Sequence, residues 1–185
     1  MKRICALVLG VVVALAGGMM APGLASARPA ANQQAIDYVL KRALTQRGVP
    51  YTYGGGDASG PSLGVEPTVT TAEADPLISA FGTTPVVVEP KPRVAGFDAS
   101  GLIVYSFAGV GIKLPRSSGE QYKVGRKIPP SLALPGDLIF YGPEGTQSVA
   151  LFLGNGQMLE ATTPAVTVSP VRTNNMAPYL SRIIE

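Results

Sequence analysis

The stretch GFDASGLIVYSF, from Gly96 to Phe107, decides how the fold of this sequence is to be interpreted. Asp98 is a preferred helix N-cap residue and stands directly before small residues and an apolar run, which predicts a helix beginning near Ala99. The helix should end near Gly109 to Gly111. The side chains expected to face a core are Leu102, Ile103, Tyr105 and Phe107.

Elements on both sides of this stretch predict the fold class. Before it, NQQAIDYVLKRALTQRG has apolar residues at helical spacing, with Asn32 as the expected N-cap and Gly48 as the stop. After it come a short helix over 117–123, a buried strand in LIFYG and a hairpin around Asn155-Gly156. AVTVSPV and YLSRIIE supply further strands. Helices followed by an antiparallel sheet predict an α+β domain.

The first 27 residues have the layout of a secretory signal peptide. Lys2 and Arg3 precede an apolar run, and ASA at residues 25–27 offers a small-residue cleavage site. A retained membrane anchor is the alternative, but glycines and a proline interrupt the run before it reaches spanning length. We therefore predict cleavage after Ala27, a secreted protein, and no membrane association afterwards.

Charge and composition exclude several kinds of site. The chain has 15 basic and 12 acidic residues; loss of Lys2 and Arg3 leaves 13 against 12, which does not indicate a nucleic-acid surface. It has no histidine, and its one cysteine, Cys5, lies in the predicted signal peptide. Cys/His catalysis, Ser/His/Asp triads, the usual zinc sites and disulfides are thereby excluded from the mature protein. We expect no metal, no cofactor and a monomer.

Residues 28–185 are expected to form a single domain with one insert. The segment from about 57 to 95 holds six prolines, several threonines and only short apolar runs. This composition is typical of an excursion from a domain, either an ordered surface loop or a disordered one.

Four motifs follow one another along the chain: GVPYTYGGG, FDASGLIVYSFAGVGIKLPRSSGEQY, LPGDLIFYG and SVALFLGNGQMLEAT. In this order they resemble the NlpC/P60 family of cell-wall peptidases, and the resemblance implies a location in the cell envelope, at the cell wall. The second motif is most similar to the Rip group of mycobacterial proteins, and its lack of cysteine resembles a catalytically defective member of that group. The resemblance covers about Asn32 to Glu185 except the insert. It implies the papain-like fold of the family, with N-terminal helices packed on an antiparallel sheet.

The resemblance also implies a site. The family hydrolyses the peptidoglycan stem peptide, commonly between D-Glu and diaminopimelate, with a cysteine, a histidine and a third polar residue. Those positions fall on Ala99, Ser148 and Glu160, and a site tyrosine falls on Tyr51 or Tyr53. Because the cysteine and histidine are both replaced, the sequence predicts a pseudoenzyme that binds peptidoglycan without hydrolysing it.

Binding is expected to use the positive end of the predicted helix. We hypothesise that N–H groups near Ala99, Ser100 and Gly101 accept a ligand carboxylate, and that Arg116 pairs with another. Plainer roles are also open: Asp98 as a cap, one tyrosine in the core, Gly54 to Gly56 as a turn, and Glu160 on a solvated strand face. The full set of predicted ligand-binding residues is Tyr51, Tyr53, Asp98, Ala99, Ser100, Gly101, Arg116, Ser148 and Glu160.

Two other functions are open at this point. The protein could regulate an active cell-wall hydrolase as a partner-binding pseudoenzyme, with the insert as the contact surface. It could also be a weak endopeptidase with an atypical site, using Ser100 or Ser148 as nucleophile or the carboxylates of Asp98 and Glu160 as acid and base. Successive helical residues point about 100° apart, so Ser100 does not simply replace a nucleophile at position 99.

Overall fold

The computed structural model describes residues 29–65 and 94–185. The predicted signal peptide and most of the predicted insert lie outside these residues, whereas 57–65 belong to an ordered loop. Ser62 in this loop pairs with Gly96, just before the second helix. In the described part of the chain, no helix is long and apolar enough to cross a membrane.

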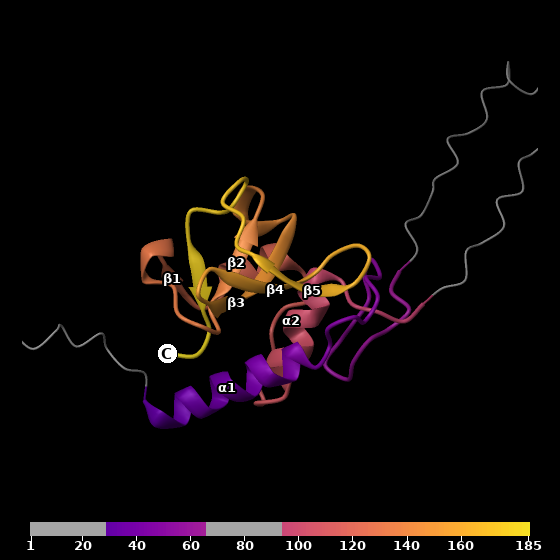
Figure 1. The fold of residues 1–185 in the computed structure, drawn as a ribbon, viewed down its shortest axis with the longest axis horizontal. Coiled ribbons are helices and arrows are strands. Elements are labelled where there is room, and N and C mark those ends of the chain that lie inside the picture. The colour runs from indigo at the N-terminus through magenta and orange to yellow at the C-terminus, as the bar shows by residue number, and fades with distance from the viewer. Residues whose placement is uncertain (1–28, 66–93) are drawn as a thin grey trace, which may run out of the picture.

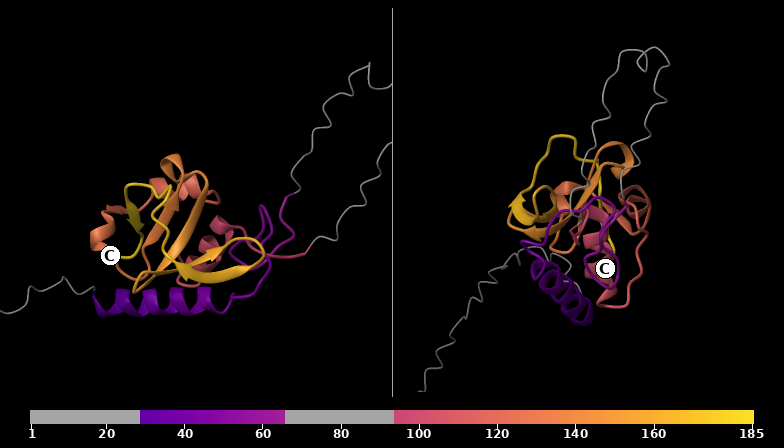
Figure 2. Two further views of the ribbon diagram at one scale, coloured as in Figure 1. Left: turned by 45° about the horizontal axis from the view of Figure 1, so that its top comes forward. Right: turned by 90° about the vertical axis from the view of Figure 1, so that its right-hand side faces the viewer.

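Helix α1, Ala30–Leu44, runs along one side of the sheet (Figures 1 and 2). Its buried stripe consists of Ile36, Val39 and Ala43. Asn32 is not the N-cap, because the helix begins two residues earlier after Pro29, and the Asn32 amide instead donates to the backbone carbonyl of Glu185. The helix also ends four residues before Gly48. That glycine, at φ 83°, closes the following turn and donates its N–H to Val166.

Helix α2, Ala99–Ala108, has the predicted start and core-facing side. The Asp98 carboxylate accepts a hydrogen bond of 2.7 Å from the Gly101 N–H, which confirms Asp98 as the N-cap. Leu102, Ile103 and Phe107 are buried. Tyr105 is only half-buried, with the Arg42 guanidinium 3.7 Å from its ring centre. Helix α3, Ser118–Lys123, is also as predicted and is capped by Ser117.

A six-stranded antiparallel sheet follows the helices, in the order β1-β6-β2-β3-β4-β5. The α+β class is therefore confirmed. Strand β1 was not predicted, because three residues are too few to establish an alternating pattern. The strands are β1 (Arg126–Ile128), β2 (Leu138–Tyr141), β3 (Ser148–Gly154), β4 (Gln157–Ala161), β5 (Val166–Pro170) and β6 (Leu180–Arg182).

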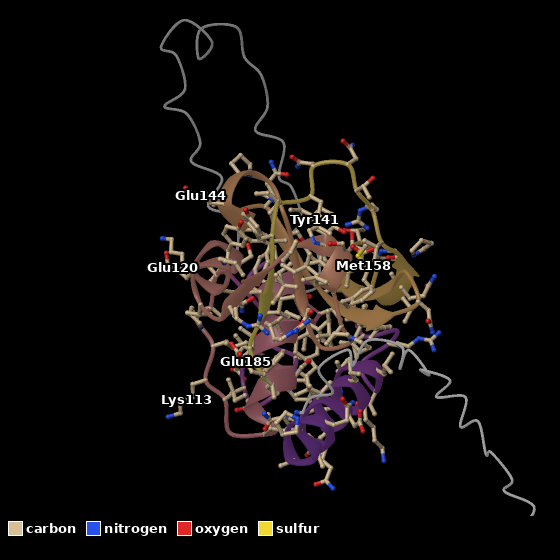
Figure 3. All side chains as sticks on the ribbon, turned by 90° about the vertical axis from the view of Figure 1, so that its left-hand side faces the viewer. Lys113, Glu120, Tyr141, Glu144, Met158 and Glu185 are labelled. Atoms are coloured by element: carbon tan, nitrogen blue, oxygen red, sulfur yellow. The ribbon has the colours of Figure 1, made fainter. Side chains whose placement is uncertain are left out.

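The sheet buries side chains on both faces, which explains the uninterrupted apolar run of β2. Leu138 and Phe140 belong to the main core, together with residues of α1 and α2. Ile139 and Tyr141 belong to a smaller cluster on the opposite face. There the Tyr141 hydroxyl lies 3.1 Å from the sulfur of Met158, and the two side chains are labelled in Figure 3.

Candidate functional site

A groove of about 620 Å³ lies at the N-terminal end of α2. One side is formed by the loop that carries Tyr51, Tyr53 and Gly54, with Val65 beside it. The other side is formed by the start of β3 and the end of β4. The lining there and at α3 is rich in hydroxyl groups, from Ser117, Ser118, Thr146, Ser148, Thr162 and Thr163, with the amide of Gln147 among them.

The groove brings together seven of the nine predicted ligand-binding residues. Tyr51, Tyr53, Asp98, Ala99, Ser100, Arg116 and Ser148 line it, whereas Gly101 and Glu160 do not. The hydroxyl-bearing residues of α3 and of the strand ends were not predicted. They come from three separate chain segments that only the fold brings to one place, and single serines and threonines give no motif.

Asp98 and Arg116 form a closed network beside Ala99. The two terminal nitrogens of Arg116 each lie 2.9 Å from one Asp98 oxygen, so the pair is bidentate. The same nitrogens also donate to the Ser100 hydroxyl and to the Gly55 carbonyl, each at 2.9 Å. All four N–H bonds on these two nitrogens therefore have acceptors within the protein. Arg116 thus ties the Gly54–Gly56 loop to the start of α2.

This network bears on the carboxylate site that the sequence predicts at the N-terminal end of α2. The Gly101 N–H donates to Asp98 and is not available to a ligand. Asp98 also places a negative charge next to the positive end of the helix, where a ligand carboxylate was expected. Among the described residues, no acceptor is recorded for the N–H groups of Ala99 and Ser100.

Position 99 presents only a methyl group to the groove. Ala99 is the first residue of α2, and the opposite wall at the start of β3 presents the hydroxyl of Ser148, paired in the sheet with Tyr141. Cysteine and histidine are absent from the described lining. The two positions therefore face one groove, as the motif comparison predicts, without a thiol or an imidazole.

The two tyrosines differ in their surroundings. Tyr51 packs against the main core and also reaches the groove, while Tyr53 leaves 63% of its surface exposed at the rim. Burial, and then the charge of Asp98 and the neighbouring Tyr53, raises the pKa of Tyr51. Its hydroxyl therefore stays protonated at neutral pH and can donate a hydrogen bond.

The plainer interpretation of Glu160, as a residue on a solvated strand face, is wrong. Glu160 is 4% exposed on β4, and its carboxylate accepts bonds from Arg172 at 2.6 Å and Ser169 at 2.5 Å. Burial acts to raise the pKa of Glu160, but the hydrogen bonds and positive charge of Arg172, with the Ser169 bond, lower it overall. Arg172 and Ser169 were missed because nothing in the sequence links them to Glu160.

The lowered pKa predicts an acid-sensitive contribution to stability. A carboxyl with a depressed pKa in the folded state stabilises fully above its unfolded pKa of about 4.3, and the contribution disappears as pH falls through the folded value. We expect Glu160→Gln to be about 1 kcal/mol less stable at pH 7, a modest loss because Arg172 is half exposed. The difference from wild type should shrink between pH 5 and pH 3 in urea unfolding. A constant difference across that range would contradict the prediction.

Gly101 permits a close approach between α2 and the Gly54–Gly56 loop. A Cβ at this position would lie 2.3 Å from the Gly55 carbonyl oxygen and 2.8 Å from that of Gly56. Because backbone cannot move aside easily, Gly101→Ala should cost about 1–3 kcal/mol in urea unfolding. Gly109→Ala, at the other end of α2, is the control because its Cβ meets the flexible side chains of Arg42 and Tyr38. Equal stability of the two variants would argue against this role for Gly101.

Comparisons with known proteins agree with this fold and site. The model of the NlpC/P60 family matches residues 48–185. Peptidoglycan endopeptidase RipB of Mycobacterium tuberculosis is 51% identical over 164 residues, which are 87% of this chain and 58% of RipB. RipA of the same organism is 51% identical over 156 residues, 83% of this chain and 28% of RipA. The chain thus spans only part of these relatives.

A solved structure of a catalytically defective Rip protein is also similar, as the sequence resemblance predicts. RipD of M. tuberculosis, described as a non-catalytic NlpC/p60 domain protein adapted to peptidoglycan binding, is 52% identical with a TM-score of 0.65. The match covers 82% of this chain and 98% of the RipD chain.

Structures of RipA with single sites mutated reveal a shared spacing. The mutated cysteine and histidine are 49 positions apart, and the histidine and a mutated glutamate are 12 apart. Ala99, Ser148 and Glu160 have the same two separations. Because the family model matches residues 48–185, and the fold and the groove agree with that match, the chain belongs to the NlpC/P60 family.

Proposed function

We propose that this protein is a secreted, non-catalytic NlpC/P60 protein that binds the stem peptides of peptidoglycan in the groove without hydrolysing them. The observation that carries the proposal is Ala99, which puts a methyl group at the first turn of α2 where an attacking thiolate would stand. The shared spacing with RipA supports the assignment of this position.

Hydrolysis by the chemistry of the family needs a nucleophile and a base within reach of one carbonyl. Ala99 cannot attack, and Ser148 offers a hydroxyl that is not a base at neutral pH. The chain has no histidine at all, and its single cysteine is Cys5. The description of RipD as non-catalytic and peptidoglycan-binding supports the same conclusion for a 52% identical chain.

Carboxylate catalysis has little support from the geometry. Asp98 is held by Arg116 and by the Gly101 N–H, so its oxygens already accept several bonds. Glu160 is buried and does not line the groove. An acid and a base must both reach the scissile bond, and these two carboxylates do not share the groove.

The groove is suited to hold a peptide. Its volume lies within the roughly 300–1,000 Å³ typical of ligand sites. Its hydroxyl groups can both donate and accept hydrogen bonds, and peptide N–H and C=O groups require both. Tyr53 adds an exposed aromatic face at the rim. Export through the N-terminal segment would deliver this groove to the cell wall.

The test is co-sedimentation of the mature chain, residues 28–185, with purified diaminopimelate-type sacculi across a salt series. We expect saturable pelleting that survives moderate salt, with no release of soluble peptides. Tyr53→Ala should weaken binding about tenfold, since it removes an exposed aromatic at the groove. Tyr179→Ala, with 47% of its surface exposed away from the groove lining, is the matched control. Absence of pelleting, or peptide release abolished by Glu160→Ala, would refute the proposal.

Binding to another cell-wall hydrolase is the second candidate. Exposed apolar side chains at both ends of the insert favour it, namely Leu63 and Val65 at its start and Val94 at its end. Leu63→Ser combined with Val94→Ser changes this surface outside the groove lining. A stem-peptide binder should keep its affinity for sacculi in this variant, whereas a partner that docks on these side chains would be lost.

A further inference from the structure

The charged groups of the groove neutralise each other. Of the described side chains that line it, only Asp98 and Arg116 carry a formal charge, and they form the bidentate pair described above. The other polar groups are hydroxyls and one amide. The described lining therefore has no net charge, although the positive end of a ten-residue helix opens into it.

We infer that the groove selects a stem peptide whose carboxyl groups are amidated over the same peptide with free carboxylates. This inference rests on the proposed function and names the form of the ligand. It reverses the expectation from sequence that the helix end and Arg116 receive ligand carboxylates.

The geometry disfavours a carboxylate in two ways. A carboxylate binds arginine best through two parallel N–H bonds, and the four N–H bonds on the terminal nitrogens of Arg116 already reach Asp98, Ser100 and Gly55. A carboxylate near Ala99 would also meet the like charge of Asp98, which caps the same helix end. Opening the pair to admit the ligand would leave Asp98 without its cation.

An amide meets neither obstacle. Its N–H₂ group donates and its C=O accepts, so it can pair with hydroxyls such as Ser118, Ser148 and Thr162 in either direction. The N–H groups of Ala99 and Ser100 can bond a neutral carbonyl without adding charge beside Asp98.

The experiment compares two synthetic stem tripeptides that contain D-glutamate and diaminopimelate and differ only in having free or amidated carboxyl groups. Calorimetry with the mature wild-type chain should give at least about tenfold tighter binding of the amidated form at low salt. The difference should shrink as salt screens the charges.

Asp98→Asn supplies the decisive variant. Asparagine is also a good N-cap, so the helix start is retained while Arg116 loses its counter-charge. We expect the free-carboxylate peptide to gain about tenfold, which removes or reverses the preference. Glu120→Gln changes the net charge equally, but Glu120 lies outside the groove lining, where it projects from the surface (Figure 3) and forms an exposed pair with Lys123. It should leave the preference unchanged.

Each other outcome overturns a distinct claim. Equal affinities in the wild type, or tighter binding of the free acid, would overturn the charge inference alone. Equal weakening of both peptides by Asp98→Asn would do so too, because it would indicate only a structural role. Pelleting of the protein with sacculi, without binding of either peptide, would overturn the stem peptide as the ligand. Failure of the protein to pellet with sacculi would overturn the proposed function itself.

Discussion

A variant that carries both Ala99→Cys and Ser148→His is expected to release soluble peptides from peptidoglycan, whereas the wild type releases none. A cysteine at the first turn of α2 would have its thiolate stabilised by the helix end. A histidine at the start of β3 would face the same groove and serve as its base. We expect the double variant to exceed either single variant by about 10²-fold in turnover, measured by chromatography of released peptides.

Arg172 is expected to limit the turnover of the double variant. It donates a hydrogen bond of 2.6 Å to the Glu160 carboxylate, so a histidine at position 148 would have to compete with Arg172 for Glu160, the residue that would orient the imidazole. Adding Arg172→Ala to the double variant should therefore raise turnover further, and adding Arg172→Lys, which keeps the charge, should not. A folded double variant no more active than the single ones would indicate that the groove has drifted by about 1 Å or more from a productive geometry.

Replacing Asp137 with alanine is expected to cost about 3–5 kcal/mol of stability, the largest structural effect we predict. Asp137 is fully buried at the end of the LPGD turn, and the Arg182 side chain on β6 is 9% exposed. The carboxylate accepts bonds of 2.8 and 2.7 Å from Arg182 and a third of 2.8 Å from the Leu134 N–H. Without it, the buried Arg182 charge would keep just one acceptor within the described part of the chain, the Leu132 carbonyl.

Urea unfolding measures this cost, and a surface pair provides the control. Glu120 and Lys123 form an ion pair whose side chains are both more than half exposed, so Glu120→Ala should leave the unfolding midpoint nearly unchanged. A second check replaces both buried partners, Asp137→Leu with Arg182→Met, which should be less destabilising than Asp137→Ala. A midpoint for Asp137→Ala close to that of Glu120→Ala would contradict the prediction.

Local sequence patterns predicted most of the helices and strands. They failed where a contact with a residue distant in sequence determines the local structure. Asp98 caps its helix as expected, and Asn155-Gly156 forms the predicted hairpin turn, because each signal acts within a few residues. Asn32 was wrong as a cap because α1 begins before it, and its amide bonds the distant Glu185. Strand β1 exists through its pairing with β6, far along the chain.

The sequence by itself determined what this site lacks. With no histidine, and its one cysteine at Cys5, no arrangement of the chain can assemble a Cys/His pair. The order of the motifs determined the family and the positions of Ala99 and Ser148. Chemistry that requires a particular atom is excluded by composition, whatever the fold.

Only the tertiary structure decided how the site is charged. Asp98 and Arg116 are 18 residues apart, and no sequence pattern shows that they neutralise each other in the groove lining. Glu160 and Arg172 are likewise joined only by the fold. Charge interactions depend on distance and burial in three dimensions, so the sequence lists the charges while the packing of α2 against the sheet determines which of them remain available to a ligand.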